Sequence, residues 1–228
     1  VQAEEIDVPE EFLADREWHI RRPRPDRGLM AEVAKAIRGA KRPMIIAGGG
    51  VIYSDAHDAL RNFVEATGIP VGTSQAGGGS LTWDHAQNLG AVGATGTLAA
   101  NRVAAEADLI IGIGTRYSDF TTSSRTAFQN PKVKFININV AAFDAFKHGS
   151  ATPIVADAKA AISDLNIALG DYVVSADYLN GYHELKSKWD LLVDEAAEHH
   201  LDHVHGRGVG DAHALDELAL DVQPLEEL

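Results

Sequence analysis

Two loops of this sequence carry the groups best suited to bind an anionic ligand. Thr115 and Arg116 follow the apolar run 108–114, and the Arg116 guanidinium could contact a phosphate or a carboxylate through two parallel N–H groups. Three consecutive glycines follow the apolar run 44–47, where their amides and the start of a helix could hold a phosphate. In an open parallel sheet, ligands lie beside the loops at the carboxyl ends of the strands. We therefore take seven residues as candidates for a ligand-binding edge: Gly48, Gly49, Gly50, Gln75, Gly114, Thr115 and Arg116.

Each loop also has a purely structural interpretation. A triple glycine permits a tight turn and close packing of a helix, and this alternative is at least as strong as phosphate binding. The dinucleotide-binding fingerprint fails because Tyr53 stands where its third glycine belongs and no acidic residue ends the second predicted strand. Arg116 could equally pair with Asp119 or with a neighbouring domain. The sequence therefore indicates where a ligand would lie without naming the ligand.

No catalytic residue and no metal ligand is assigned from the sequence. His199 and His203 are one helical turn apart, a spacing that can chelate zinc, but they stand in a polar tail without a matching carboxylate pattern. No serine lies in a Gly-x-Ser-x-Gly turn, so a serine hydrolase is not indicated. Asp84 beside His85 is a possible acid and base pair in a loop, and one such pair is weak evidence.

The elements that must position these loops alternate between strand and helix. Short apolar runs predict strands, and helices are expected between them because parallel strands need crossover connections. The predicted strands are 44–47, 69–71, 108–114, 133–138 and 154–155. Thr97 and Asp157 are expected to cap the helices that follow them, and Ser54 the helix that Gly68 ends. This alternation predicts an α/β fold, a doubly wound and mostly parallel sheet of five or six strands.

The sequence divides into four segments. Residues 1–27 are charged and interrupted by prolines, which predicts an extended incoming linker. Residues 28–170 form the predicted central α/β domain. Residues 171–205 have a helical pattern and predict an outgoing connector. Residues 206–228 have weak periodicity and form a tail of uncertain order.

Composition argues against several classes of protein. The 228 residues are 45% hydrophobic, enough to fill a core, and the lack of cysteine fits a reducing cytoplasm. The net charge is −13, of which −9 falls in residues 191–228, so the sequence lacks the basic character expected of a nucleic-acid-binding protein. No apolar run approaches the roughly 20 residues of a membrane span, and no signal peptide opens the chain. We therefore expect a cytoplasmic protein that binds neither nucleic acid nor membrane.

Four longer motifs carry a resemblance to a known family. They are 42–51 (RPMIIAGGGV), Gly96-Thr97 with Ala100-Asn101, 107–109 (ADL) and 155–159 (VADAK). Over about residues 28–170 the chain resembles the central domain of thiamine diphosphate-dependent enzymes, in the branch that includes acetolactate synthase. The resemblance implies a Rossmann-like fold, thiamine diphosphate and Mg²⁺ as cofactors, and a homodimer or homotetramer.

Further motifs distinguish members of this branch. Residues 73–77 (TSQAG), 114–122 (GTRYSDFTT) and 143–148 (FDAFKH) resemble hydrolases that cleave a carbon–carbon bond in a cyclic trihydroxy-1,2-dione during inositol breakdown. Flavin-bearing synthases of the family usually carry aspartates where this sequence has Asn137 and Asn139, so the resemblance argues against bound FAD. The implied function is ring opening, and an acetolactate synthase-like carboligase with flavin in this domain is the alternative.

The resemblance also implies parts that this sequence does not contain. In the family, a glutamate of an N-terminal domain activates the thiamine ring, and a Gly-Asp-Gly motif of a C-terminal domain holds the magnesium diphosphate. Gly170-Asp171 and Gly210-Asp211 lack the second glycine of that motif. We therefore expect the central part of a longer enzyme, inactive alone, with flanking thiamine-binding domains as partners and a small molecule as substrate. A non-catalytic nucleotide-binding or assembly module is the second alternative.

Overall fold

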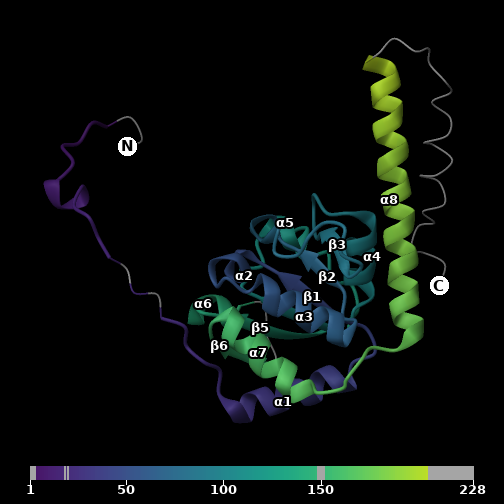
Figure 1. Ribbon diagram of the computed structural model, residues 1–228, viewed down its shortest axis with the longest axis horizontal. Coiled ribbons are helices and arrows are strands. Elements are labelled where there is room, and N and C mark those ends of the chain that lie inside the picture. Colours follow the sequence, from purple (N-terminus) through teal and green to yellow (C-terminus); the bar gives the residue numbers. More distant parts are fainter. Residues whose placement is uncertain (1–3, 18, 20, 148–151, 205–228) are drawn as a thin grey trace.

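The computed structural model describes residues 4–17, 19, 21–147 and 152–204, with side chains up to residue 197. Its centre is one sheet of six parallel strands in the order β3-β2-β1-β4-β5-β6 (Figure 1). The strands are β1 (Pro43–Ala47), β2 (Val71–Thr73), β3 (Asn88–Ala91), β4 (Leu109–Ile113), β5 (Lys134–Asn139) and β6 (Thr152–Val155). The predicted α/β class and parallel sheet are confirmed, and β3 is a strand that the apolar runs did not predict.

Helices connect the strands and flank the sheet. The longer ones are α1 (Arg27–Gly39), α3 (His57–Thr67), α4 (Leu98–Glu106), α7 (Ala158–Leu169) and α8 (Ala176–Val204). The short ones are α2 (Gly49–Tyr53), α5 (Asp119–Thr122), α6 (Ala142–Ala145) and the 3₁₀ turns η1 (Glu10–Phe12) and η2 (Gln75–Gly77). Both faces of the sheet are thereby covered, as a doubly wound fold requires.

The two helical layers follow from the alternation of side chains along the strands. On one face, Ile45 and Ile111 pack in a core with α1, α3 and α7. On the other, Met44 and Ile110 pack in a second core with α4 and the first turns of α8. Every residue of β1 and β4 is buried, which explains why these strands are continuous apolar runs in the sequence.

Three of the predicted helix ends are confirmed. The Thr97 hydroxyl accepts a hydrogen bond from the Ala100 amide at 3.0 Å, and the Asp157 carboxylate accepts one from the Ala160 amide at 3.1 Å. Gly68 ends α3 in the left-handed conformation, with φ +68°. These caps satisfy helix-terminal groups that have no partner within the helix.

The prediction that Ser54 caps α3 is wrong. Ser54 lies at the end of α2, and α3 begins three residues later at His57. The Ser54 hydroxyl donates to the Asp157 carboxylate at 2.7 Å and accepts a hydrogen bond from the Lys159 amide at 2.9 Å. Ser54 therefore supports the start of α7, because the buried Asp157 carboxylate needs donors and the Ser54 hydroxyl supplies one.

The incoming segment is fastened to the domain at the same place. Arg22 Nη1 contacts Asp157 Oδ2 at 3.0 Å and also donates to the Ser54 carbonyl oxygen, while the Asp157 amide donates to the Pro23 carbonyl at 2.8 Å. Arg24 pairs with Asp164 of α7 at 3.2 Å. The chain is thus fixed against α7 just before α1 begins.

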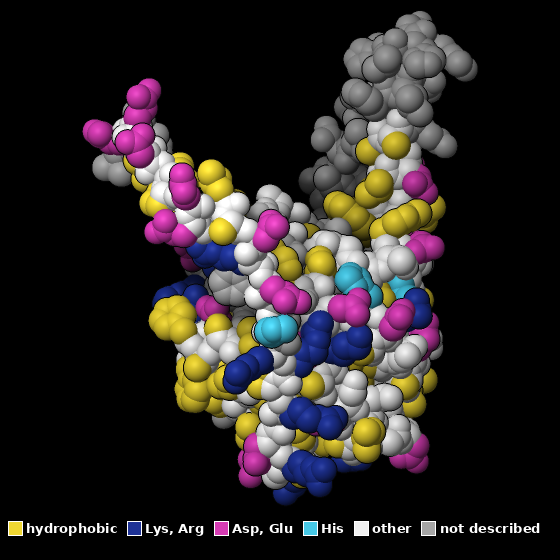
Figure 2. Space-filling view, turned by 60° about the vertical axis from the view of Figure 1, so that its left-hand side comes forward, with side chains coloured by type: hydrophobic (Ala, Val, Ile, Leu, Met, Phe, Trp, Pro, Cys, Tyr) yellow, Lys and Arg dark blue, Asp and Glu magenta, His cyan; other side chains and the backbone are white. Residues whose placement is uncertain are grey.

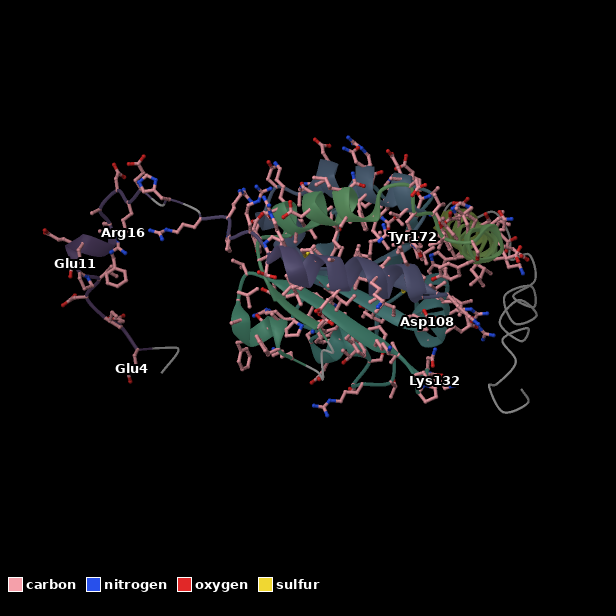
Figure 3. All side chains as sticks on the ribbon, turned by 90° about the horizontal axis from the view of Figure 1, so that it is seen from below. Glu4, Glu11, Arg16, Asp108, Lys132 and Tyr172 are labelled. Carbon is pink, nitrogen blue, oxygen red and sulfur yellow. The ribbon has the colours of Figure 1, made fainter. Side chains whose placement is uncertain are left out.

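The two ends of the described chain extend away from the sheet. Figure 3 shows Glu4, Glu11 and Arg16 on a segment well separated from the domain, and Figure 1 shows α8 continuing past the strands. Acidic side chains are concentrated on the N-terminal segment, whereas lysines and arginines gather on the domain face below it (Figure 2). No helix in the described ranges has the length and apolar character needed to cross a bilayer.

Replacing Asp157 tests the importance of this junction. Asp157→Ala removes the cap of α7 and leaves Ser54 and Arg22 without their acceptor, so we expect the free energy of unfolding to fall by about 2–4 kcal/mol. Urea unfolding followed by circular dichroism measures it. The matched control is Asp58→Ala, whose carboxylate pairs with Arg61 but is 81% exposed, and a loss of at most about 0.5 kcal/mol is expected there. Equal losses in the two variants would contradict a structural role for the junction.

Candidate functional site

The candidate site lies where the order of the strands reverses. The chain passes from β1 outward to β2 and β3, and then returns to β4, which pairs with β1 on its other side. The loops that follow β1 and β4 therefore leave neighbouring strands at the same edge and turn to opposite faces. In open α/β sheets this switch point is the usual place for a ligand.

The glycines at this edge allow two backbones to touch. A Cβ atom on Gly48 would lie 2.5 Å from the Thr115 Cα, and one on Gly50 would lie 2.6 Å from the Gly114 Cα. Gly114 itself has φ +60°, a conformation that favours glycine. The close approach accounts for Gly48, Gly50 and Gly114 without any ligand.

The amides of the triple glycine are partly engaged within the chain. The Gly48 amide donates to the Ile113 carbonyl at 2.8 Å, and the Gly50 amide donates to the Gly114 carbonyl at 3.0 Å. The Gly114 amide in turn donates to the Ile138 carbonyl at 2.8 Å. A phosphate would have to compete for these donors, so the geometry favours the packing interpretation of the glycines over a phosphate cradle.

Hydrogen bonds join four successive loops into one rim. The Ser74 amide donates to the Ala47 carbonyl at 2.9 Å, which holds the β2 loop against β1. Gln75 Nε2 donates to the Thr95 hydroxyl at 3.1 Å and thereby links the β2 loop to the β3 loop. The Ala94 amide donates to the Phe120 carbonyl of α5 at 2.8 Å, which closes the connection to the β4 loop. Gln75 thus lies at the same edge as the glycines, and Thr95 is a partner that the sequence did not indicate.

In the loop that follows β4, the Tyr117 side chain is buried in the domain and the Arg116 side chain is exposed. Tyr117 is buried with φ +49°, and its ring packs edge-on against Phe128 and Phe135 at centroid distances of 6.3 and 5.9 Å. Burial raises the pKa of the Tyr117 phenol, so this group stays protonated. Arg116, the residue before it, is consequently turned to the surface.

Arg116 and Thr115 have different environments. Thr115 is buried, and its carbonyl oxygen accepts a hydrogen bond from Asn139 Nδ2 at 3.1 Å. Arg116 is exposed, and within the described ranges its guanidinium forms no ion pair with Asp119 or any other acid. Asn139 therefore fixes the loop by a hydrogen bond to its backbone. The Arg116 guanidinium is exposed at the carboxyl edge of the sheet.

The remaining candidates lie elsewhere. His85 Nε2 contacts the Glu65 carboxylate at 3.4 Å in the segment before β3, away from the carboxyl edge. The side chains of His199 and His203 lie outside the described residues. Among the side chains that the structure places, no group of three or more His, Asp or Glu could hold a metal ion. The described rim exposes Arg116 and Gln75 to solvent, and it brings together no acid and base pair for proton transfer.

The fold and this rim define a Rossmann-like central domain, and comparison with protein families agrees. Residues 30–165 match the family described as thiamine pyrophosphate enzyme, central domain, and the chain belongs to that family. Relatives named 3D-(3,5/4)-trihydroxycyclohexane-1,2-dione hydrolase are similar over most of the chain. The identity is 45% over 190 residues for the Geobacillus thermodenitrificans protein, 40% over 190 for that of Clostridium tetani and 44% over 189 for that of Bacillus subtilis.

These relatives are much longer than the matched region. The alignments cover 83% of this chain but only 29% of each of the three relatives. The resemblance that the motifs predicted is thereby confirmed for the family. The chain spans about three tenths of the length of the relatives it matches, which fits a central domain flanked by others.

Substitution of Gly48 tests the contact between the two backbones. Gly48→Ala places a methyl group against the Thr115 backbone, which cannot move without disturbing β4, so we expect a loss of about 3 kcal/mol or more in the free energy of unfolding. Urea unfolding of the variant provides the measurement. Gly39→Ala is the control, because nothing lies within 4 Å of a Cβ there, and its effect is expected to stay within about 1 kcal/mol. A Gly48→Ala protein as stable as this control would show that the loops are free to separate.

Proposed function

We propose that this chain is the central domain of a thiamine diphosphate-dependent hydrolase that opens the ring of a cyclic trihydroxy-1,2-dione by cleaving a carbon–carbon bond with water. The observation that carries the proposal is the identity of 40–45% to hydrolases of that name over four fifths or more of the chain. The motifs at the rim, 73–77 and 114–122, lie within residues 30–165, which match the thiamine pyrophosphate enzyme family.

The cofactors are assigned to the flanking domains of the longer enzyme. Two of the triple-glycine amides are engaged by backbone carbonyls, and the described side chains include no carboxylate cluster suited to Mg²⁺. The residues that the structure describes thus do not fit the magnesium diphosphate group. We propose that this domain holds the cofactor-binding domains apart and that its carboxyl edge faces the substrate.

Within that edge, Arg116, Thr115 and Gln75 are proposed to lie nearest to the active site. Arg116 is exposed and forms no ion pair with a described residue, so it can donate to a carbonyl or hydroxyl oxygen of a polyhydroxylated substrate. Thr115 fixes the position of Arg116 through its hydrogen bond from Asn139. Gly48 and Gly50 contact Gly114 of this loop, Gly49 lies against Ala76 of the β2 loop, and these four glycines complete the proposed set.

We also propose which cofactor the protein lacks, its oligomeric state and its location in the cell. No FAD is expected, since amides replace the aspartates that flavin-bearing synthases carry at Asn137 and Asn139. A cytoplasmic homodimer or homotetramer is expected, with a small molecule as substrate and without nucleic-acid or membrane partners. These features come from the family resemblance and from the composition of the chain.

Activity of the longer enzyme is the direct test. With 3D-(3,5/4)-trihydroxycyclohexane-1,2-dione, we expect ring opening that depends on added thiamine diphosphate and Mg²⁺, and no flavin absorbance in the purified protein. The chain of 228 residues alone is expected to be inactive. Formation of acetolactate from pyruvate by a yellow, flavin-containing protein would replace the proposal with a carboligase.

Arg116 gives the sharpest test of the rim. Arg116→Ala in the longer enzyme is expected to lower kcat/KM by about 10- to 100-fold, because a charged donor to the substrate would be lost. The thermal midpoint should be unchanged, since the exposed guanidinium forms no hydrogen bond or ion pair within the described ranges. Arg61→Ala, at an exposed arginine that pairs with Asp58, serves as the control with unchanged kinetics. Wild-type kinetics for Arg116→Ala would remove this residue from the site.

A further inference from the structure

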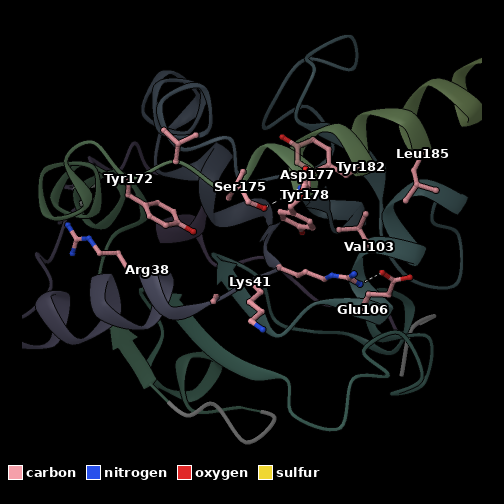
Figure 4. A pocket seen from close by; sticks show the side chains of 15 residues that line it. Arg38, Lys41, Val103, Glu106, Tyr172, Ser175, Asp177, Tyr178, Tyr182 and Leu185 are labelled. Carbon is pink, nitrogen blue, oxygen red and sulfur yellow. Dashed lines mark hydrogen bonds and ion pairs between the residues drawn. The ribbon is translucent and has the colours of Figure 1, made fainter. Parts of the chain in front are cut away.

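A cavity of about 680 Å³ lies at the end of the sheet opposite the rim. It opens between the start of α8 and the turn that joins α1 to β1, where Pro43 begins the strand. Figure 4 shows Tyr178, Tyr182 and Leu185 of α8 facing Val103 and Glu106 of α4 across this space. Its volume is in the range of pockets that hold small molecules.

The α8 wall presents aromatic rings whose polar ends are already bonded. The Tyr178 hydroxyl donates to the Pro43 carbonyl at 3.0 Å, and the Tyr182 hydroxyl donates to the Gly68 carbonyl at 2.7 Å. Burial raises the pKa of both phenols, that of Tyr182 to about 12, so both remain neutral donors. These two side chains therefore contribute apolar ring surface to the wall of the cavity.

The opposite wall is richer in cationic groups. Arg38 donates to the Ala168 and Leu169 carbonyls, and Arg42 pairs with Glu106, so both guanidinium groups are engaged. Lys41 also lines the cavity, and its ammonium group forms no ion pair within the described ranges. The other acid of the lining, Asp177, stands in the first turn of α8, where a helix favours negative charge.

The cavity is also lined by Tyr172, whose hydroxyl could donate a hydrogen bond to a ligand. The Tyr172 amide donates to the Leu169 carbonyl at 3.1 Å, and the hydroxyl forms no hydrogen bond within the described part of the chain. Burial, and then the nearby Asp108 carboxylate, raise the pKa of the Tyr172 phenol, which keeps it a donor. Asp108 itself is occupied by the amides of Lys41 and Arg42, at 2.8 and 2.9 Å.

The glycine inside α8 is not required by any contact with the residues that the structure describes. Gly181 lies in the helix interior, where glycine costs about 1 kcal/mol relative to alanine. No atom lies within 4 Å of the position of its Cβ, so packing does not require a glycine there. Because Gly181 lines the cavity, its missing side chain leaves room beside the rings of Tyr178 and Tyr182.

We propose that this cavity is a binding site for a small anion with an aromatic or apolar body. The body would lie against the tyrosine rings in the space left by Gly181, and the anionic group would meet the Lys41 ammonium and the Tyr172 hydroxyl. The site is separate from the rim and does not depend on the proposed catalytic function. Its position at the amino ends of the strands makes it a site for an effector rather than for the substrate.

Ligand binding can be followed with ¹H–¹⁵N spectra of the 228-residue chain at constant ionic strength. Phenyl phosphate is the probe, inorganic phosphate presents the anion without a body, and benzyl alcohol presents a body without charge. We expect phenyl phosphate alone to give saturable shifts, confined to residues 38–42 and 172–185. Shifts that do not saturate, or that are scattered over the domain, would overturn the site. Equal binding of inorganic phosphate would overturn the role of the aromatic wall.

Variants of the two walls separate binding from folding. Gly181→Leu should fold, because its side chain enters open space, but should weaken phenyl phosphate binding about tenfold or more by filling that space. Gly181→Ala should raise the thermal midpoint, in keeping with the better helix propensity of alanine. Lys41→Ala should weaken binding about tenfold and Lys41→Arg should largely restore it. Lys188→Ala, at an exposed lysine of α8 paired with Glu184, is the control. Unchanged affinity in both Gly181→Leu and Lys41→Ala would refute the proposal.

Discussion

Direct contact between the backbones that follow β1 and β4 is the constraint on which the site depends. Gly48 and Gly50 lie so close to Gly114 and Thr115 that no side chain fits between them. The two hydrogen bonds from the glycine amides then fix the β4 loop relative to β1. Since both strands are fully buried in the sheet, the loop bearing Arg116 takes its position from the close-packed core of the fold.

The buried carboxylate of Asp157 is a second constraint, and it joins the domain to the chain that enters it. An isolated buried charge would be costly, but Asp157 accepts from Ser54, Arg22 and the Ala160 amide. One side chain thereby caps α7, holds the α2 turn and fastens the incoming segment. The direction of that segment just before α1 is consequently set by the domain.

The sequence predicted strands and helix ends correctly where the local preference of the residues agrees with their packing in the fold. The strands β1 and β4 are apolar runs because both faces are covered, and Thr97 and Asp157 cap helices through contacts only three residues away. The strand β3 was missed because Asn88–Ala91 contains a glycine and no β-branched residue, and it pairs only at the edge. Ser54 was misassigned because its partner, Asp157, is 103 residues away in the sequence. The seven rim candidates could be located from strand ends alone, whereas the contact of Gln75 with Thr95 depends on the sheet order.

The asparagines of β5 connect this architecture to the question of flavin. Asn139 donates its side-chain amide to the Thr115 carbonyl, and Asn137 donates to the Lys147 carbonyl, each at 3.1 Å. An aspartate at either position would carry only acceptor oxygens and would face a carbonyl oxygen instead of bonding to it. The loop that bears Arg116 would then lose its support from below and would need another conformation. A single hydrogen bond, from the Asn139 side chain to the Thr115 carbonyl, therefore links β5 to the rim. The choice of asparagine or aspartate at position 139 consequently affects where residue 116 lies.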